Sequence, residues 1–445
     1  MGLVLVAAMT AFLGATHLSA ARLDSEAVLF TAAPSYLPLA WTSGGERFPR
    51  GASIYYRDGK GTRKLFPDFA QSADANISFD GTRLLFSGKK LKSDPWQIWE
   101  ASFADLVPRQ VTHTSDDAIR PFYLPDDRIV YSAKQNGTFV LVNASLDGSG
   151  QQQISFAATN IVATDVLRDG RILLNAAYSG QNESSPEIFA VFSDGSGFES
   201  IRCDHEPVRF AGRESSTGDI VFTHGSNLGM FSSPLASEKK VGLPPADYAG
   251  DVVETTSHDW IVATRTTGSG VFALRLWKPN GGPTTPYASI PSQNLVQPQV
   301  RTVRPVPKKH PSALHDWKFA NLLALNVYTS KFNLVHGSVA TVRVYSQESN
   351  GAEGLLGSSP VEADGSFFVR VPGDTPIKFE LADSHGNTLQ REKGWFWARS
   401  GEQRICVGCH AGPEHAPENA VPMVLERSTV PIDMTKILSS QTGGH

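Results

Sequence analysis

This chain of 445 residues has no excess of basic residues, no long apolar run after its N-terminal segment and few cysteines. Each of these features excludes some classes of function. Basic residues are not in excess: 40 Lys and Arg stand against 44 Asp and Glu, and the net charge of −4 argues against a nucleic-acid partner. Long apolar runs are also missing, so we expect no membrane span beyond the N-terminal segment. Cysteine occurs only three times, as Cys203, Cys406 and Cys409, and two of these lie close together.

The first 21 residues have the features of a secretory signal peptide. Gly2 to Leu13 are apolar and uncharged, and Ala20 and Ala21 are small residues suited to signal-peptidase cleavage. The alternative is a membrane anchor, but the apolar run is short for crossing a bilayer. We therefore expect cleavage after Ala20 or Ala21 and a periplasmic or secreted protein.

Two sequence patterns repeat through residues 22–296. A turn followed by a β-rich apolar run recurs roughly every forty to fifty residues, the period of a propeller blade. Its copies begin at Asp80, Asp126, Asp169, Thr217 and His258. In phase with it, strands run into tight turns at Asp58-Gly59, Asp147-Gly148, Asp194-Gly195 and Asn280-Gly281. Together with a first strand at Ala27–Phe30, the repeats predict six blades. They resemble the WD40-like propeller of the TolB family, which implies architecture and no particular chemistry.

The composition changes after the repeats. Residues 297–316 are rich in proline, which favours an extended linker. Strand-like runs return in residues 317–431 and predict a small antiparallel β-sandwich, followed by a tail at 432–445. The sequence thus predicts an all-β protein: a six-bladed β-propeller followed by a small β-sandwich-like domain.

The motif Cys406-Val407-Gly408-Cys409-His410 carries the chemistry. Cys-x-x-Cys-His is the attachment signal for haem c: the two thiols bind the porphyrin covalently, and the adjoining histidine coordinates the iron. Half of a zinc site, a redox-active dithiol and a plain disulfide remain alternatives. Covalent haem agrees with the export signal, because haem c is attached outside the cytoplasm in bacteria.

Several short motifs precede this one in a fixed succession: Asn326-Val327-Tyr328, Arg343-Val344, Asp364-Gly365-Ser366-Phe367, Val371-Pro372 and Gly401-Glu402. In this order they resemble the haem-binding middle domain of hydrazine synthase alpha subunits, which follows a propeller in that family. The resemblance implies one covalent haem c held by Cys406 and Cys409. The family has a tyrosine at the iron a few residues beyond the motif, where this chain has Ala411 to His415. We therefore expect ordinary ligation by His410.

Further residues are candidates for contact with the haem. Met423 is the first candidate for a weak sixth ligand of the iron. If Met423 does not bind, we expect the sixth position to be empty. Arg399 and Arg404 could pair with the propionates, and Trp397 could pack on the porphyrin. The sequence thus predicts a monohaem c-type cytochrome whose propeller docks a redox partner protein. The alternative is a haem enzyme acting on a small nitrogen compound between propeller and haem.

Overall fold

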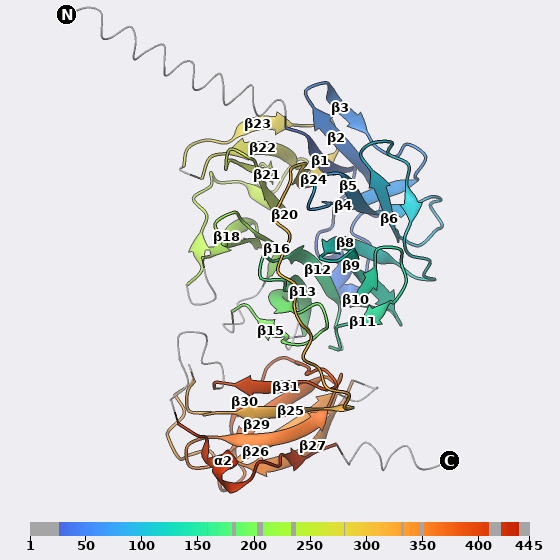
Figure 1. Ribbon diagram of the computed structural model, residues 1–445. Coiled ribbons are helices and arrows are strands. Elements are labelled where there is room, and N and C mark those ends of the chain that lie inside the picture. The colour runs from blue at the N-terminus through green and yellow to red at the C-terminus, as the bar shows by residue number, and fades with distance from the viewer. Residues whose placement is uncertain are drawn as a thin grey trace, which may run out of the picture.

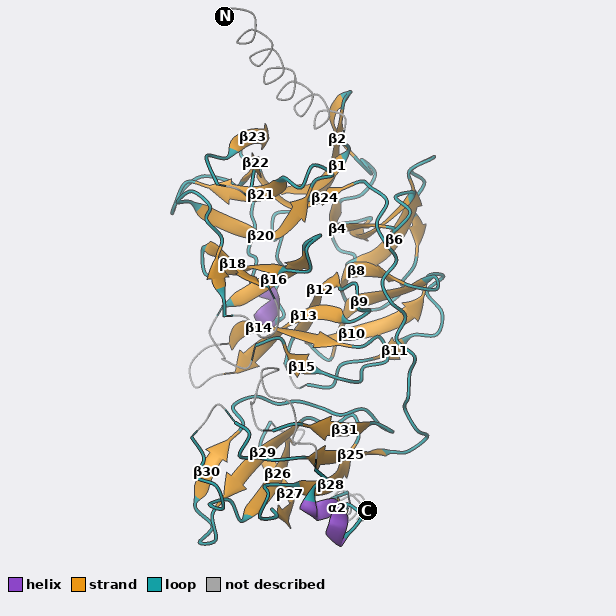
Figure 2. Cartoon of the chain, turned by 60° about the vertical axis from the view of Figure 1, so that its left-hand side comes forward, coloured by secondary structure: helices purple, strands orange, loops and turns teal. Residues whose placement is uncertain are grey.

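A computed structural model describes residues 26–157, 159–179, 184–202, 208–232, 237–279, 281–330, 333–347, 351–408 and 420–435. Within these ranges the strands form eight four-stranded sheets. Six of the sheets make a propeller and two make a sandwich at one end of the molecule (Figure 1). Among the described residues, helical structure is limited to a 3₁₀ turn, η1 (Ala40–Ser43), and one short helix, α2 (Met423–Arg427) (Figure 2). No helix of the described residues is long and apolar enough to cross a membrane.

The propeller has the six blades that the repeats predicted, each with four antiparallel strands. From axis to rim, the first three blades are β24 (Asn294–Val300), β1 (Val28–Ala33), β2 (Ser53–Asp58), β3 (Gly61–Lys64); β4 (Gln71–Ile77), β5 (Arg83–Lys89), β6 (Gln97–Ser102), β7 (Arg109–Gln110); β8 (Ala118–Leu124), β9 (Arg128–Gln135), β10 (Thr138–Ser145), β11 (Gln152–Gln153). The last three are β12 (Ile161–Val166), β13 (Ile172–Ser179), β14 (Ser184–Val191), β15 (Glu199–Ser200); β16 (Arg209–Glu214), β17 (Ile220–His224), β18 (Asn227–Phe231), β19 (Lys239–Lys240); β20 (Asp247–Glu254), β21 (Trp260–Arg265), β22 (Ala273–Trp277), β23 (Thr285–Ala288).

The ring is closed by β24, which comes from the C-terminal end of the propeller and pairs with β1 from its N-terminal end. Residues 297–300 therefore belong to the first blade and not to the linker that their proline pattern indicated. Pro298 is tolerated because β24 is the innermost strand and has a ladder partner on one side only. Closure removes the free sheet edge that an open array would expose.

The repeated turns join the innermost strand of a blade to its second strand. Gly81 and Gly170 occupy them with φ of 73° and 92°, the left-handed region that glycine enters without strain. In the third blade Asp126 and Asp127 take the same role, with φ of 62° and 50°. The apolar runs that made the repeat visible are thus the second strands, which are paired on both sides.

The innermost strands share an irregularity that the repeats did not reveal. The register of each shifts at a bulge near its middle, as between Ala73 and Asn76 in β4. Residues with φ between 52° and 64° stand at these bulges: Asp74, Arg120, Ala211, Asp251 and Gln297. Bulges re-aim side chains and interrupt pairing. Four of these five residues, all except Ala211, have side chains that join the charged network described below.

The sandwich consists of two four-stranded sheets around one apolar core. One sheet has the order β31 (Gln403–Cys406), β25 (Phe319–Ala324), β28 (Phe367–Pro372), β32 (Ile432–Asp433). The other has the order β27 (Glu353–Pro360), β26 (Thr341–Gln347), β29 (Ile377–Ala382), β30 (Thr388–Arg391). The first sheet is mixed, because β31 and β32 lie parallel to their neighbours, so the expected purely antiparallel sandwich is wrong. The sheet also takes in Ile432 and Asp433, which the sequence had assigned to the tail.

The linker between the two domains crosses one face of the propeller (Figure 1). Its backbone is held by hydrogen bonds from Arg304 N to Phe79 O (2.7 Å) and from Lys308 N to Arg168 O (2.9 Å). Gly170 permits this crossing, because a Cβ atom there would lie 2.1 Å from Lys308 O. The His310 ring stacks on Phe192 with centroids 3.9 Å apart. The linker is therefore a fixed part of the structure.

Candidate functional site

Cys406 ends β31 at the edge of the mixed sheet. The strand pairs in parallel with β25, with Cys406 opposite Ala324, and the Cys406 carbonyl accepts a hydrogen bond from Leu325 N at 2.9 Å. The preceding Ile405 is 65% exposed, whereas Cys406 is half-buried and forms no disulfide within the described residues. The first cysteine of the motif thus stands at a fixed point on an open sheet edge.

Gly408 fixes the segment that follows Cys406. A Cβ atom at Gly408 would lie 2.0 Å from Thr329 O and 2.9 Å from Asn326 O. Because such a carbon cannot be accommodated beside backbone oxygens, only glycine allows this approach. The spacer between the two cysteines is therefore pressed against the turn that follows β25.

A second glycine packs on the same turn. A Cβ atom at Gly365, where φ is 86°, would lie 2.8 Å from the Asn326 side-chain oxygen and 2.9 Å from Val327 N. The Asn326 Oδ1 atom also accepts a hydrogen bond from Tyr328 N at 2.8 Å, which stabilises the turn. Three of the motifs that are separate in sequence thus meet at residues 326–329.

Met423 is linked to this cluster through its backbone. Asp364 Oδ2 accepts a hydrogen bond from Met423 N at 2.8 Å, and Ser366 Oγ accepts one from Val424 N at 3.1 Å. These bonds satisfy amides at the start of α2, which have no partner within the helix. Met423, the predicted sixth ligand, therefore begins a helix anchored beside Gly365. Cys409 and His410 lie outside the described residues.

The Cys406 thiol has an unusual environment for a reactive cysteine. Burial raises its pKa, and the nearby Arg404 guanidinium opposes this shift only in part. Redox-active dithiols and metal-binding thiolates instead occur where positive charge lowers the pKa. Burial thus disfavours the thiolate form of Cys406, which a redox-active dithiol or a metal site would use.

The other predicted haem contacts lie at the interface with the propeller. Trp397 is fully buried, its ring stacks on Phe198 at 3.7 Å, and its Nε1 donates to Gly195 O at 3.0 Å. Arg399 pairs with Asp374 at 2.7 Å, and Arg404 donates to the Phe198 carbonyl. Trp397 and Arg404 thus contact the fourth blade and hold the sandwich against it, whereas the Arg399–Asp374 pair lies within the sandwich. The contact of these three residues with haem stays a prediction.

A charged network on the propeller axis was missed by the sequence reasoning. Arg47 and Asp74 form two hydrogen bonds, at 2.8 and 2.6 Å, and the Gln297 amide donates to Asp74 at 2.6 Å. Asp251 accepts from Arg120 at 3.0 Å and from Arg213 at 3.2 Å. Burial alone would raise the pKa of Asp74 and Asp251, but the facing guanidinium groups outweigh it and hold both below the usual range.

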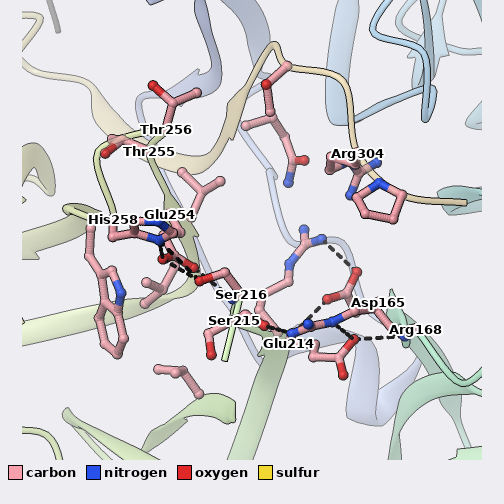
Figure 3. A pocket seen from close by; sticks show the side chains of 18 of the residues that line it. Asp165, Arg168, Glu214, Ser215, Ser216, Glu254, Thr255, Thr256, His258 and Arg304 are labelled. Atoms are coloured by element: carbon pink, nitrogen blue, oxygen red, sulfur yellow. Dashed lines mark hydrogen bonds and ion pairs between the residues drawn. The ribbon is translucent and has the colours of Figure 1, made fainter. Parts of the chain in front are cut away.

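A cavity of about 460 Å³ opens beside this network, on the face that the linker crosses (Figure 3). The strands β12, β16, β20 and β24, the turns that follow the first three, and linker residues 302–307 provide most of its wall. Ser216, Glu254 and His258 cluster at one side, where His258 Nδ1 lies 2.5 Å from Glu254 and 3.2 Å from Ser216 Oγ. One nitrogen faces both partners, so the cluster cannot relay a proton from serine through both ring nitrogens to the carboxylate.

The comparisons with known proteins bear mainly on the sandwich. Residues 328–411 match the hydrazine synthase alpha subunit middle domain. The matched range begins at the turn that follows β25, and it includes Gly365, Gly408 and the Cys-x-x-Cys-His motif. Hydrazine synthase subunit alpha of Kuenenia stuttgartiensis is 36% identical over 59 residues, which are 13% of this chain and 7% of that subunit.

One solved structure extends the likeness of fold to the propeller. Kuenenia stuttgartiensis hydrazine synthase superposes with a TM-score of 0.77 and 18% identity, covering 90% of this chain and 71% of that chain. TolB from Acinetobacter baumannii gives a TM-score of 0.47 with 14% identity, over 64% of this chain and 67% of that one. The succession of a propeller and a hydrazine synthase alpha-like domain is thus shared with hydrazine synthase.

Proposed function

We propose that the chain is an exported monohaem c-type cytochrome, with haem c bound to Cys406 and Cys409 and His410 as the proximal ligand. The observation that carries the proposal is the contact of Gly408 with the turn at residues 326–329. It holds the spacer of the motif on the sheet beside Cys406, within the segment that matches the hydrazine synthase alpha middle domain. A fixed spacer suits a group that must be attached through two thiols at once.

The residues present fit such a group. Cys406 is half-buried and forms no disulfide with a described residue, and the neighbouring residue Ile405 is open to solvent. Bound there, haem would supply one-electron transfer or binding of a small molecule. The anchoring of α2 by Asp364 and Ser366 would fix how near Met423 comes to the motif. Met423 then serves as a weak sixth ligand, or the position is open.

The propeller, in this proposal, docks a redox partner protein in the periplasm or outside the cell. The interface supports the arrangement, because Trp397 enters the apolar cluster formed by the third and fourth blades. Glu402 Oε1 also accepts a hydrogen bond from Gly197 N at 3.2 Å. A partner bound to the propeller would therefore meet the haem domain in one fixed orientation.

A second candidate is a haem enzyme that acts on a small nitrogen compound. The segment around the motif favours it, because its similarity is to a subunit named for hydrazine synthesis. The iron of an enzyme needs an open position, whereas an electron carrier keeps both axial positions occupied. The two candidates therefore differ in a property that optical spectra report.

The attachment is tested by haem staining of denaturing gels after production in a bacterium that attaches haem c in its periplasm. The wild type should keep a covalent haem band, and Cys406→Ser with Cys409→Ser should lose it. Cys203→Ser is the matched control, since it removes the one cysteine outside the motif, and should stain like the wild type. A full band in the double variant would refute the proposal.

The choice between the candidates follows from spectra of the reduced wild type with and without carbon monoxide. If Met423 is bound to the iron, we expect carbon monoxide to cause no rapid change in the wild-type spectrum. Met423→Ala should then bind carbon monoxide rapidly and have a lower reduction potential. Rapid binding to the wild type, with no effect of Met423→Ala, would favour the enzyme. Bis-histidine spectra would show that the ligand assignment is wrong.

A further inference from the structure

The cavity on the propeller face is built like a binding site, and the proposed haem chemistry does not use it. It combines a volume of about 460 Å³ with charged, amide and apolar walls (Figure 3). The linker supplies residues 302–305 and Pro307 to its wall, so the cavity lies between the propeller and the segment that leads to the sandwich. A ligand held there would contact both.

The charges that line the cavity are paired, with one exception. Each carboxylate has a partner: Asp165 pairs with Arg213 at 3.5 Å, Glu214 with Arg168 at 3.5 Å, and Glu254 with His258 at 2.5 Å. Arg304 has no ion pair within the described chain, although one of its Nη atoms donates to Ile77 O at 2.6 Å. Burial lowers the pKa of Arg304, and the charge of Asp165 opposes this shift only in part. Arg304 is thus the one arginine of the lining that forms no ion pair with a described carboxylate.

Gln299 supplies a second group without a partner. Its side chain lines the cavity, the residue is 6% exposed, and it forms no side-chain hydrogen bond to any described residue. Its amide is accessible to a molecule in the cavity, because it is not among the fully buried side-chain groups of the described residues that lack a partner. Arg304 and Gln299 belong to the same stretch of chain, five residues apart, where β24 continues into the linker. Both offer N–H donors to an anion.

Apolar side chains in the wall could contact the body of a ligand. Phe79, Val253 and Trp260 line the cavity together with Val303 and Pro305. The Arg304 guanidinium lies 5.6 Å from the centre of the Phe79 ring, so the cation and the apolar surface adjoin. The volume lies in the range of small-molecule sites.

We propose that this cavity binds a small organic carboxylate with an aromatic or aliphatic body. The carboxylate is held by Arg304 and Gln299, and the body packs against Phe79 and Val303. Arginine suits this ligand because its planar fork matches the two oxygens of a carboxylate. The inference is independent of the haem proposal, since none of the described residues of the motif, 406–408, lines the cavity.

The test uses benzoate as the probe and the uncharged benzamide as its isostere, titrated against the full-length protein by ligand-observed NMR. Benzoate should bind saturably, and benzamide at least tenfold more weakly. Arg304→Gln should weaken benzoate at least tenfold, because a hydrogen bond to a charged group contributes about 1.5–3 kcal/mol. Arg304→Lys keeps the charge and should retain part of the affinity. Thermal unfolding of each variant verifies that it is folded.

Arg301→Gln is the matched control. Arg301 lies in the same linker and donates to a backbone carbonyl, that of Gly81 at 3.0 Å, but it does not line the cavity. It should bind benzoate like the wild type. Absence of saturable benzoate binding, equal binding of benzamide, or equal loss in the Arg301 and Arg304 variants would overturn the proposal. Binding that persists in Arg304→Gln would do the same.

Discussion

The propeller and the sandwich bring their most constrained residues together by different means. On the propeller axis, side chains from separate blades meet as ions, as in the Arg47–Asp74 pair and the contacts of Arg120 with Asp251. At the edge of the sandwich, backbone atoms of neighbouring turns touch where glycines leave room, at Gly365 and Gly408. The first arrangement depends on charge, and the second on the absence of a side chain.

This difference determines which changes each region tolerates. A buried ion is costly when its partner is removed, because its own loss of hydration is then uncompensated. A close contact between backbone atoms does not depend on charge, but it is lost when a single carbon atom is added to the glycine. The propeller should therefore respond to changes of charge at constant size, and the motif segment to changes of size at constant charge.

The largest effect is expected from Asp74→Ala in the propeller. Asp74 and Arg47 are 3% and 5% exposed, so the variant leaves a buried guanidinium without its carboxylate and should lose about 3–5 kcal/mol of stability. Urea unfolding followed by hydrogen exchange of residues 71–77 measures the loss.

Asp58→Ala is the control for Asp74→Ala. Asp58 pairs with Arg63 at 3.0 Å on the rim, where the Arg63 side chain is 49% exposed, and such pairs contribute little. Its unfolding midpoint should equal that of the wild type. Equal shifts in the two variants would mean that the axial charges are not a special source of stability.

A smaller effect is expected from Gly408→Ala in the sandwich. The added carbon would lie 2.0 Å from Thr329 O, and the strain of moving the turn should cost about 3 kcal/mol. Hydrogen exchange should become faster in β25 and β31 and stay unchanged in the propeller, and covalent haem should decrease. Gly242→Ala is the control, because a Cβ atom there meets nothing within 4 Å. A Gly408→Ala variant as stable as its control would contradict the proposed role of the spacer.

The same contrast explains what the sequence could predict. The Cys406–His410 motif was visible because its chemistry requires a fixed local spacing. The blade count followed from turns such as Asp80-Gly81, whose φ angles only a few residues accept. The fold class and six blades are confirmed, whereas the haem, its ligands and the partner remain predictions.

The axial network could not be predicted, because its members lie far apart in the chain. Arg120 and Asp251 are 131 residues apart, and no local pattern joins them. The one available signal was a charged residue inside an apolar run, as Arg120 follows Ile119 in β8. Because of Pro298, the linker was predicted to begin too early in the chain. Proline is in fact compatible with a strand that has a single ladder partner.

A still smaller effect is expected from Trp397→Phe, which tests the contact between the two regions. The variant keeps the stacking on Phe198 but leaves the Gly195 carbonyl without its 3.0 Å donor, at a cost of about 1 kcal/mol. Limited proteolysis of residues 301–316 should become faster. Trp395→Phe is the control, because Trp395 packs under Lys378 within the sandwich. Equal cleavage of the two variants would show that Trp397 does not hold the domains together.

The smallest effect is expected from Asp364→Asn. This variant tests whether a charge also contributes to stability in the sandwich, where the constrained residues meet through backbone contacts. Burial tends to raise the pKa of Asp364, but hydrogen bonds from Met423 N and from Ser366 outweigh it and keep the pKa below its usual value. A carboxyl whose folded pKa is lowered stabilises the protein above its unfolded pKa, about 3.9. That contribution is lost as the pH falls through the folded pKa.

Asp364→Asn keeps an acceptor for Met423 N and removes the charge. At pH 7 we expect a loss below about 1 kcal/mol, because Asp364 is only partly buried and solvent screens its charge. The difference in stability between the variant and the wild type should shrink as the pH falls below about 4, because the protonated Asp364 side chain is uncharged like that of asparagine. Denaturant midpoints of both proteins at pH 7 and at about pH 3 measure it. A difference that stays constant across this range would mean that the anchor of α2 acts through shape alone, as the glycine contacts beside it do.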